Sequence, residues 1–229
     1  MVSPYTFQSL VSDRRQWAGI IDQPSHDISV VGGIDDFGLI VTADLERVSI
    51  QGTRCALLIR APATLTDISI TDFFGDAIII TSSNVTLKRV EIRVKKTGIP
   101  YRFLHPDGVQ LIAVDEHNRP TKGKLENIVI EDLVIYCPYV EGVSEGVRGV
   151  FAGDCQVSGL VINRFSIRTD IDEHGITVNS GFGCVIDNGE CSSINTDKKV
   201  GVILSDRKGL GAGSDNAVSN VDADFFELD

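Results

Sequence analysis

The chain has 229 residues, of which 42% are hydrophobic and 23% charged. This composition is that of a globular protein large enough to bury a core without disulfide or metal staples, so it excludes an intrinsically disordered chain. The 32 acidic residues outnumber the 21 basic ones, and the formal net charge of −11 disfavours binding to nucleic acid or to an anionic membrane surface. No apolar run approaches the ~20 residues that span a bilayer, so we expect no transmembrane segment.

The first 24 residues predict a cap at the N-terminal end of the fold. Ser3 and Pro4 have the features of a helix start, a capping hydroxyl and a proline at the first helical position. Apolar residues then recur near helical spacing up to the turn at Pro24, at Phe7, Leu10, Val11, Trp17 and Ile21. We therefore expect residues 1–24 to form an amphipathic helix. This segment lacks a basic start followed by an apolar block, so we expect no secretion signal.

A nine-residue cassette recurs along the chain. Asn, Asp or Gly comes first and is followed by three residues in which the first and third are apolar. Two polar residues then form a corner, and three more residues of the same alternating kind complete the cassette. Full copies lie at 84–92, 127–135 and 159–167, with a shortened copy at 67–73. Period-two alternation on either side of a polar pair predicts two short strands joined by a bend, with the same positions facing inward in each copy.

A second strand begins with a small residue and precedes each cassette. Its small residues are Ala56, Ala77, Gly108, Gly149, Gly175 and Gly201, which lie 21, 31, 41, 26 and 26 residues apart. Short β-rich units with variable insertions predict an all-β protein, a single-stranded parallel β-helix in one domain. Residues 28–205 would form the stacked coils and residues 206–229 a C-terminal cap or tail. A β-sandwich is the alternative, but it would not require the same cassette at each level.

The residues just before these small positions are expected to form a column on neighbouring strands. Its members are Cys55, Asp76, Asp107, Arg148 and His174. Neighbouring strands lie ~4.8 Å apart, so each member should touch the next. Adjacent carboxylates raise one another's pKa, so such a column is costly unless it has a function. By strand parity, the small residues beside it are expected to face outward, as a floor that a ligand can approach closely.

A purely structural interpretation of the column is also open. Asp followed by Gly is a common turn pair, which accounts for Asp107 without any catalytic role. Arg148 would then neutralise Asp107 in a structural ion pair. His174 follows several acidic residues and would be a solvated imidazole paired with a carboxylate.

Two insertions enter neighbouring coils at the same edge. Residues 95–106 lead into the strand at Gly108, and residues 136–148 lead into the strand at Gly149. Long loops at one edge of a solenoid usually carry the binding function. These loops contain cationic and aromatic side chains suited to sugar rings and uronate carboxylates. The candidate substrate-binding residues are Lys95, Lys96, Tyr101, Arg102 and Tyr139, together with Gln110 on the strand itself.

The strand from His105 to Gln110 resembles the Asn-x-Asp-Gly-x-Asp strand of the polygalacturonase family and, more loosely, the pectate-lyase-like superfamily of parallel β-helices. His174 and the glycine after it look like that family's Gly-His-Gly strand. The resemblance implies a right-handed coil, with Asp107 in the place of a catalytic carboxylate and His174 in the place of a conserved histidine. His105 replaces the family's Asn, and Gln110 replaces its second carboxylate. Where the family has Asp-Asp-Cys, this chain has Arg-Gly-Val at 148–150, so both of those carboxylates are missing.

Two functional hypotheses follow. The first is a carbohydrate-active enzyme, a lyase or glycoside hydrolase of a complex polysaccharide, with an acidic one fitting the cationic loops. Asp107 would be the principal carboxylate with Asp76 nearest to it, His105 or His174 would carry a proton, and Arg148 and Arg102 would stabilise charge. The second is a non-catalytic glycan-binding or structural β-helix, such as a phage tail or virion module, either monomeric or trimeric.

We expect no cofactor. The acidic turns at 115–116 and 170–173 offer oxygens to calcium but lack the spacing of a dedicated calcium loop. None of the five cysteines falls into a C-x-x-C pair, so buried thiols are expected rather than a zinc site, with a bridge between Cys184 and Cys191 as the alternative. This usage favours folding in a reducing compartment and leaves open whether the protein acts in a virion or outside the cell.

Overall fold

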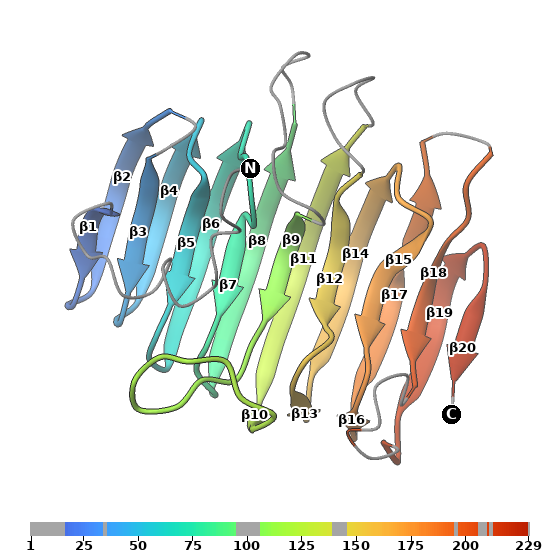
Figure 1. Ribbon diagram of the computed structural model, residues 1–229. Coiled ribbons are helices and arrows are strands. Elements are labelled where there is room, and N and C mark those ends of the chain that lie inside the picture. The colour runs from blue at the N-terminus through green and yellow to red at the C-terminus, as the bar shows by residue number, and fades with distance from the viewer. Residues whose placement is uncertain are drawn as a thin grey trace, which may run out of the picture.

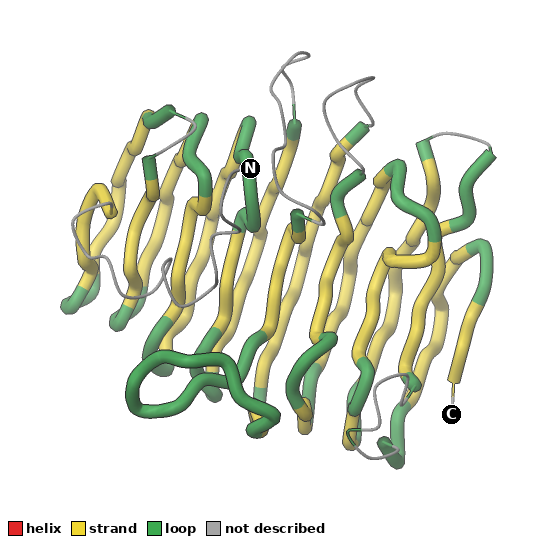
Figure 2. The backbone as a smooth tube through the Cα atoms, viewed as in Figure 1, coloured by secondary structure: helices red, strands yellow, loops and turns green. Residues whose placement is uncertain are grey.

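The computed structural model describes residues 17–33, 36–94, 106–138, 146–194, 197–205, 210 and 213–228. This part of the chain contains strands, turns and loops and no helix, as Figure 2 shows by colour. The strands form a nine-stranded, an eight-stranded and a three-stranded sheet. Every pairing between named strands is parallel.

The chain passes from one long sheet to the other in each coil, with a strand of the three-stranded sheet in between in three of the coils, so neighbours within a sheet come from successive coils. The nine-stranded sheet, in front in Figure 1, contains β1 (Trp17–Ile21), β3 (Phe37–Val41), β5 (Cys55–Ile59), β7 (Ile78–Ile80), β9 (Asp107–Leu111), β12 (Arg148–Ala152), β15 (Glu173–Val178), β18 (Val200–Leu204) and β20 (Phe226–Leu228). The eight-stranded sheet contains β2 (Ser25–Val31), β4 (Leu45–Gln51), β6 (Ala63–Thr71), β8 (Val85–Arg93), β11 (Ile128–Cys137), β14 (Val161–Thr169), β17 (Val185–Ser193) and β19 (Ala217–Ala223). The three-stranded sheet contains β10 (Lys124–Glu126), β13 (Gln156–Ser158) and β16 (Gly181–Phe182). The arrangement is compatible with the predicted parallel β-solenoid.

The core lies between the two long sheets, and the predicted cassettes supply it. Leu133 of β11 lies opposite Val90 of β8 and Phe165 of β14, so the three full cassettes stack in the register that the repeat predicts. The shortened copy at 67–73 is wrong, because Ile68 pairs with Val90 and Asp67 therefore occupies the bend rather than the start of the cassette. Within β8, Val85, Leu87, Val90 and Ile92 are buried. Burial of one such side chain contributes roughly 1.5–3 kcal/mol, so the stack is stabilised by a thin core that continues from coil to coil.

Each coil of the eight-stranded sheet bends at one residue with positive φ. In β8 this residue is Arg89, at φ 52°, the second residue of the polar corner. The bend resets the alternation, which is why inward residues on either side of the corner are three positions apart. The corner residues in chain order are Asp27, Arg47, Asp67, Arg89, Asp132, Arg164, Asn188 and Asn220.

The predicted helical cap is wrong where the structure describes it. Trp17–Ile21 forms β1, which pairs with β3, and the Trp17 ring packs 5.0 Å from the ring of Phe37. Strand pairing and aromatic burial therefore override the weak helical spacing. The rest of the predicted cap, residues 1–16, lies outside the described residues.

The stack is also longer than the predicted 28–205. It begins with β1 and includes β19 and β20 in the segment predicted as a tail. Residues 217–223 repeat the cassette around the corner residue Asn220 with short inward side chains, Val218, Val221 and Ala223, which weaken the apolar signal.

All five cysteines are free and buried, as predicted, and Cys184 and Cys191 form no bridge. Within the described ranges, no helix has the length and apolar character needed to cross a membrane.

Candidate functional site

Three members of the predicted column contact one another. Asp107 opens β9 and Arg148 opens β12, and the strand register places them opposite each other. The guanidinium binds the carboxylate with two hydrogen bonds, from Nε to Oδ1 at 2.5 Å and from Nη2 to Oδ2 at 2.9 Å. Asp76, one coil earlier, accepts a 2.9 Å hydrogen bond from the backbone N–H of Asp107. These three residues therefore lie together as the column predicts, and Asp107 and Arg148 form the ion pair of the structural interpretation.

His174 joins this cluster through Phe151. The Arg148 guanidinium lies 3.6 Å from the centroid of the Phe151 ring, and the His174 ring meets the same phenyl ring edge-on at 5.9 Å. Nδ1 of His174 lies 3.0 Å from Oγ1 of Thr177. Phe151 is not among the predicted site residues. It lies between two inward positions of the repeat, at a position where the repeat allows any residue.

The carboxyls differ in access to solvent. Asp107 is fully buried, whereas Asp76 is only partly buried. Burial raises the pKa of Asp76 to about 6, against the opposing effects of the Asp107 N–H and the Arg148 charge. Burial and then the Asp76 charge raise the pKa of Asp107, and Arg148 lowers it. Because Arg148 binds both oxygens of Asp107, it opposes the rise in the pKa of Asp107, while a pKa of about 6 places the titration of Asp76 near neutral pH.

Cys55 lies at the other end of the cluster. Its thiol is buried, and burial followed by the charge of Asp76 raises its pKa well above the ordinary value. A thiol in this state is protonated and a poor nucleophile, so Cys55 contributes packing rather than chemistry.

The expected outward floor of small residues is wrong. A Cβ added at Gly108 would lie 2.6 Å from Cδ1 of Ile135, and one at Gly149 would lie 2.7 Å from Cγ2 of Ile167. Ile135 and Ile167 belong to the core, so these glycines face inward. Val109 also faces the core, so the start of β9 bends and two successive residues point the same way, which strict parity counting does not anticipate.

The outward face of the nine-stranded sheet instead carries an apolar row over its first coils. Ile40, Leu58 and Ile79 lie in register and are buried. They pack with Trp17, Phe37, Cys55 and Ile112, and with Val114 in the loop that follows β9. Figure 1 shows this loop projecting from the front of the nine-stranded sheet. Gln110 is the next member of the row, half-buried between Ile79 and Phe151.

Six predicted site residues lie outside the described residues and stay predictions. They are His105, Lys95, Lys96, Tyr101, Arg102 and Tyr139.

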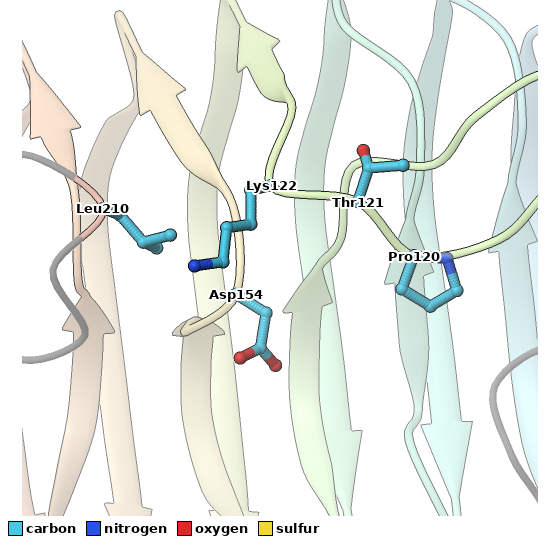
Figure 3. Close-up of a pocket in the computed structure, with 5 residues that line it drawn as sticks. All are labelled: Pro120, Thr121, Lys122, Asp154 and Leu210. Atoms are coloured by element: carbon cyan, nitrogen blue, oxygen red, sulfur yellow. The ribbon is translucent and has the colours of Figure 1, made fainter.

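Two pockets lie away from the column. One, of about 390 Å³, is lined by Pro120, Thr121, Lys122, Asp154 and Leu210 (Figure 3). The other, of about 300 Å³, is lined by residues of 24–26, 44–46, 64 and 66. Asp154, which lines the first pocket, acts on the column through its charge, which is the smallest of the effects that raise the pKa of Asp107.

The acidic turns are engaged by their own neighbours. Asp115 accepts hydrogen bonds from the backbone N–H groups of His117 and Arg119 and pairs with the Arg119 guanidinium, which lowers its pKa to about 2. Oδ1 of Asp172 accepts a hydrogen bond from the backbone N–H of Lys199. In the part of the chain that the structure describes, no three His, Cys, Asp or Glu side chains are grouped so as to hold a metal ion.

The parallel stacked sheets are compatible with a parallel β-helix. No protein-family model, no curated protein and no solved structure matches this chain.

Proposed function

We propose that this protein is a right-handed parallel β-helix of the pectate-lyase-like type that binds and cleaves a complex acidic polysaccharide at the N-terminal ends of β7, β9 and β12. The observation that carries the proposal is the partly buried residue Asp76 set beside the buried ion pair of Asp107 and Arg148. The right-handed coil follows the general preference of parallel strand crossovers.

Asp76 is the proton-transfer group in this proposal, and Asp107 positions it. Asp107 has no exposed surface, and both of its oxygens are bound by Arg148, so it cannot reach a substrate. Asp76 reaches solvent, and a pKa of about 6 suits a group that exchanges a proton near neutral pH. The backbone N–H of Asp107 fixes its carboxyl.

The arrangement favours elimination over hydrolysis. A lyase needs one base to take the proton beside a uronate carboxylate and a positive charge to stabilise the anion that forms. Asp76 offers the base. Arg148 stays paired with Asp107 and offers only its charge, which already acts on the Asp76 carboxyl. A hydrolase needs two carboxyls that act separately, and Asp107 is committed to its ion pair.

The same observation supports a second candidate, a non-catalytic glycan-binding or virion module. Asp76 is the one carboxyl of the described column without a guanidinium partner, so binding without turnover is the natural alternative.

The test compares Asp76→Asn with Glu116→Gln, an exposed carboxyl in the loop after β9. Polygalacturonate and a panel of other acidic glycans are the substrates, and release of unsaturated ends is followed by ultraviolet absorbance. Asp76→Asn should lower turnover by at least ~100-fold and leave folding intact, because an amide accepts the same hydrogen bond but takes no proton. Glu116→Gln should keep full turnover. Equal turnover in all three proteins would remove Asp76 from the mechanism, and tight glycan binding without product from the wild type would favour the second candidate.

A further inference from the structure

The eight-stranded sheet carries a row of two arginines and a tyrosine, on a different sheet from the Asp76 column. Tyr136 on β11 pairs in register with Arg93 on β8 and with Arg168 on β14. The Arg93 guanidinium carbon lies 5.7 Å from the centroid of the Tyr136 ring, and that of Arg168 lies 6.0 Å from it. A guanidinium from each neighbouring strand therefore stacks with one ring, and we call these three residues the Arg–Tyr–Arg row.

The row faces outward. Each of its members follows a fully buried residue, namely Ile92, Ile135 and Ile167. Because side chains alternate along a strand, residues next to the core positions lie on the solvent side of the sheet. The same register continues through Gln51 and Thr71 on one side and Ser192 on the other, which are polar and uncharged.

The row concentrates positive charge on a protein with a net charge of −11. Arg93 pairs with Glu91, which lies two residues earlier on the same strand. The next acid on this face, Glu190, accepts a 2.6 Å hydrogen bond from Ser166. Arg168 is exposed, and among the described residues it forms neither a hydrogen bond nor an ion pair. Its planar set of N–H donors is therefore open to an anion.

The geometry fits a polymer with anionic groups at regular intervals better than a single small anion. The two arginines are separated by two strand spacings, ~9.6 Å, on an open sheet surface. Guanidinium groups bind carboxylates and sulfates through paired hydrogen bonds, and stacking on a tyrosine holds them in place before a ligand arrives. Nucleic acid fits less well, since its binding relies on many phosphate contacts and the overall negative field opposes it.

We propose that the Arg–Tyr–Arg row is a binding subsite for the anionic groups of an acidic glycan chain, on the sheet that does not carry Asp76. The inference shares its ligand class with the proposed function, but it needs no catalysis. The row would hold a polymer on the protein independently of cleavage.

Binding is measured by calorimetry with an oligogalacturonate and with its methyl-esterified form, which has the same length and no charge, and with a sulfated glycan. Arg168→Gln should weaken binding of the acidic oligomer about tenfold, the loss expected for one charge-assisted contact. Binding of the esterified oligomer should not change. Lys88→Gln is the matched control, because it removes the same charge from a half-buried residue earlier on β8, where Lys88 pairs with Glu131. It should alter binding less than twofold.

The role of the ring is tested on its own. Tyr136→Phe keeps the stacking and should bind as the wild type does, whereas Tyr136→Leu should weaken binding as Arg168→Gln does.

Three results would overturn the inference. The first is an equal loss of glycan affinity in Arg168→Gln and Lys88→Gln. The second is binding of a single-stranded oligonucleotide that is tighter than binding of the acidic glycan and depends on Arg168. The third is a wild-type protein that binds neither the carboxylated nor the sulfated glycan. Failure here is separate from failure of the proposed function. A loss of binding in Arg168→Gln without any turnover by the wild type would remove only the catalytic proposal, and turnover that depends on Asp76 without an effect of Arg168 would remove only this one.

Discussion

Two kinds of carboxyl coexist in this protein, and the environment of each decides the direction of its pKa. At the column, burial is the largest effect and raises the pKa values of Asp76 and Asp107. At the exposed corners, the hydrogen bond from an arginine is the largest effect and lowers the pKa values of Asp67 and Asp132. The two groups therefore give opposite contributions to the dependence of stability on pH.

Asp76→Asn should isolate the contribution of the column. Because the folded protein raises the pKa of Asp76 from 3.8 to about 6, its favourable contribution is complete below pH 3.8 and is lost as pH rises through about 6. The difference amounts to about 3 kcal/mol. The variant should match the wild type at pH 3.5 and exceed its free energy of unfolding by up to that amount at pH 8, measured by urea denaturation. A difference that does not change with pH would contradict the assignment.

The juxtaposition of Asp76, Asp107 and Arg148 was predictable because the recurring strand that begins with a small residue fixes which residue lies beside which in successive coils. Their burial was not. Whether a side chain faces in or out was counted by parity, and the bend at the start of β9 turns both Gly108 and Val109 inward. Such a bend depends on how closely the two sheets approach, which the pattern of a single strand does not contain.

At the scale of the structural element, the corners of the eight-stranded sheet form a ladder of alternating charge. Asp27, Arg47, Asp67, Arg89, Asp132 and Arg164 follow one another at successive levels, each with positive φ. Arginines at this φ are disfavoured because their Cβ crowds the backbone. Here each arginine binds the preceding aspartate through two hydrogen bonds, as Arg164 binds Asp132 at 2.6 and 3.0 Å. If a strand paired with the strand two coils away instead of with its native neighbour, Asp would lie beside Asp and Arg beside Arg. The alternating charges therefore favour the native pairing of the strands.

Asp132→Asn tests the ladder without disturbing the backbone. Asn adopts positive φ readily, and Asn188 and Asn220 occupy the same corner in later coils. The folded protein lowers the pKa of Asp132, so its contribution is present above the ordinary pKa and is lost as pH falls through the lowered value. We expect a melting temperature a few degrees lower than that of the wild type at pH 7 and low salt. The loss should shrink in high salt and disappear in strong acid, whereas an equal loss under all three conditions would indicate a steric cause.

At the scale of the whole molecule, the order of the coils could be predicted from the repeat, and the ends could not. The cassettes predicted strands that recur and stack, as β6, β8, β11 and β14 do. The first and last described coils carry weaker patterns, as the short inward side chains Val218, Val221 and Ala223 of β19 show. Gly189 in β17 shows a similar effect within the stack, where the absence of a side chain leaves room for the ring of Phe165 and interrupts the apolar pattern.

The same asymmetry predicts a gradient of local stability along the stack. In the middle coils Ile130, Leu133 and Ile135 have no exposed surface, whereas the core-facing Ile28 and Val30 of β2 are only partly buried and Leu228 at the other end is 54% exposed. Each coil contacts only its neighbours, so opening an end coil exposes less apolar surface than opening a central one. Native-state hydrogen exchange followed by mass spectrometry should therefore show amide protection that is highest in β8 and β11 and falls toward β2 and β19. Uniform protection across these four strands would mean that the stack opens as one cooperative unit, contrary to this expectation.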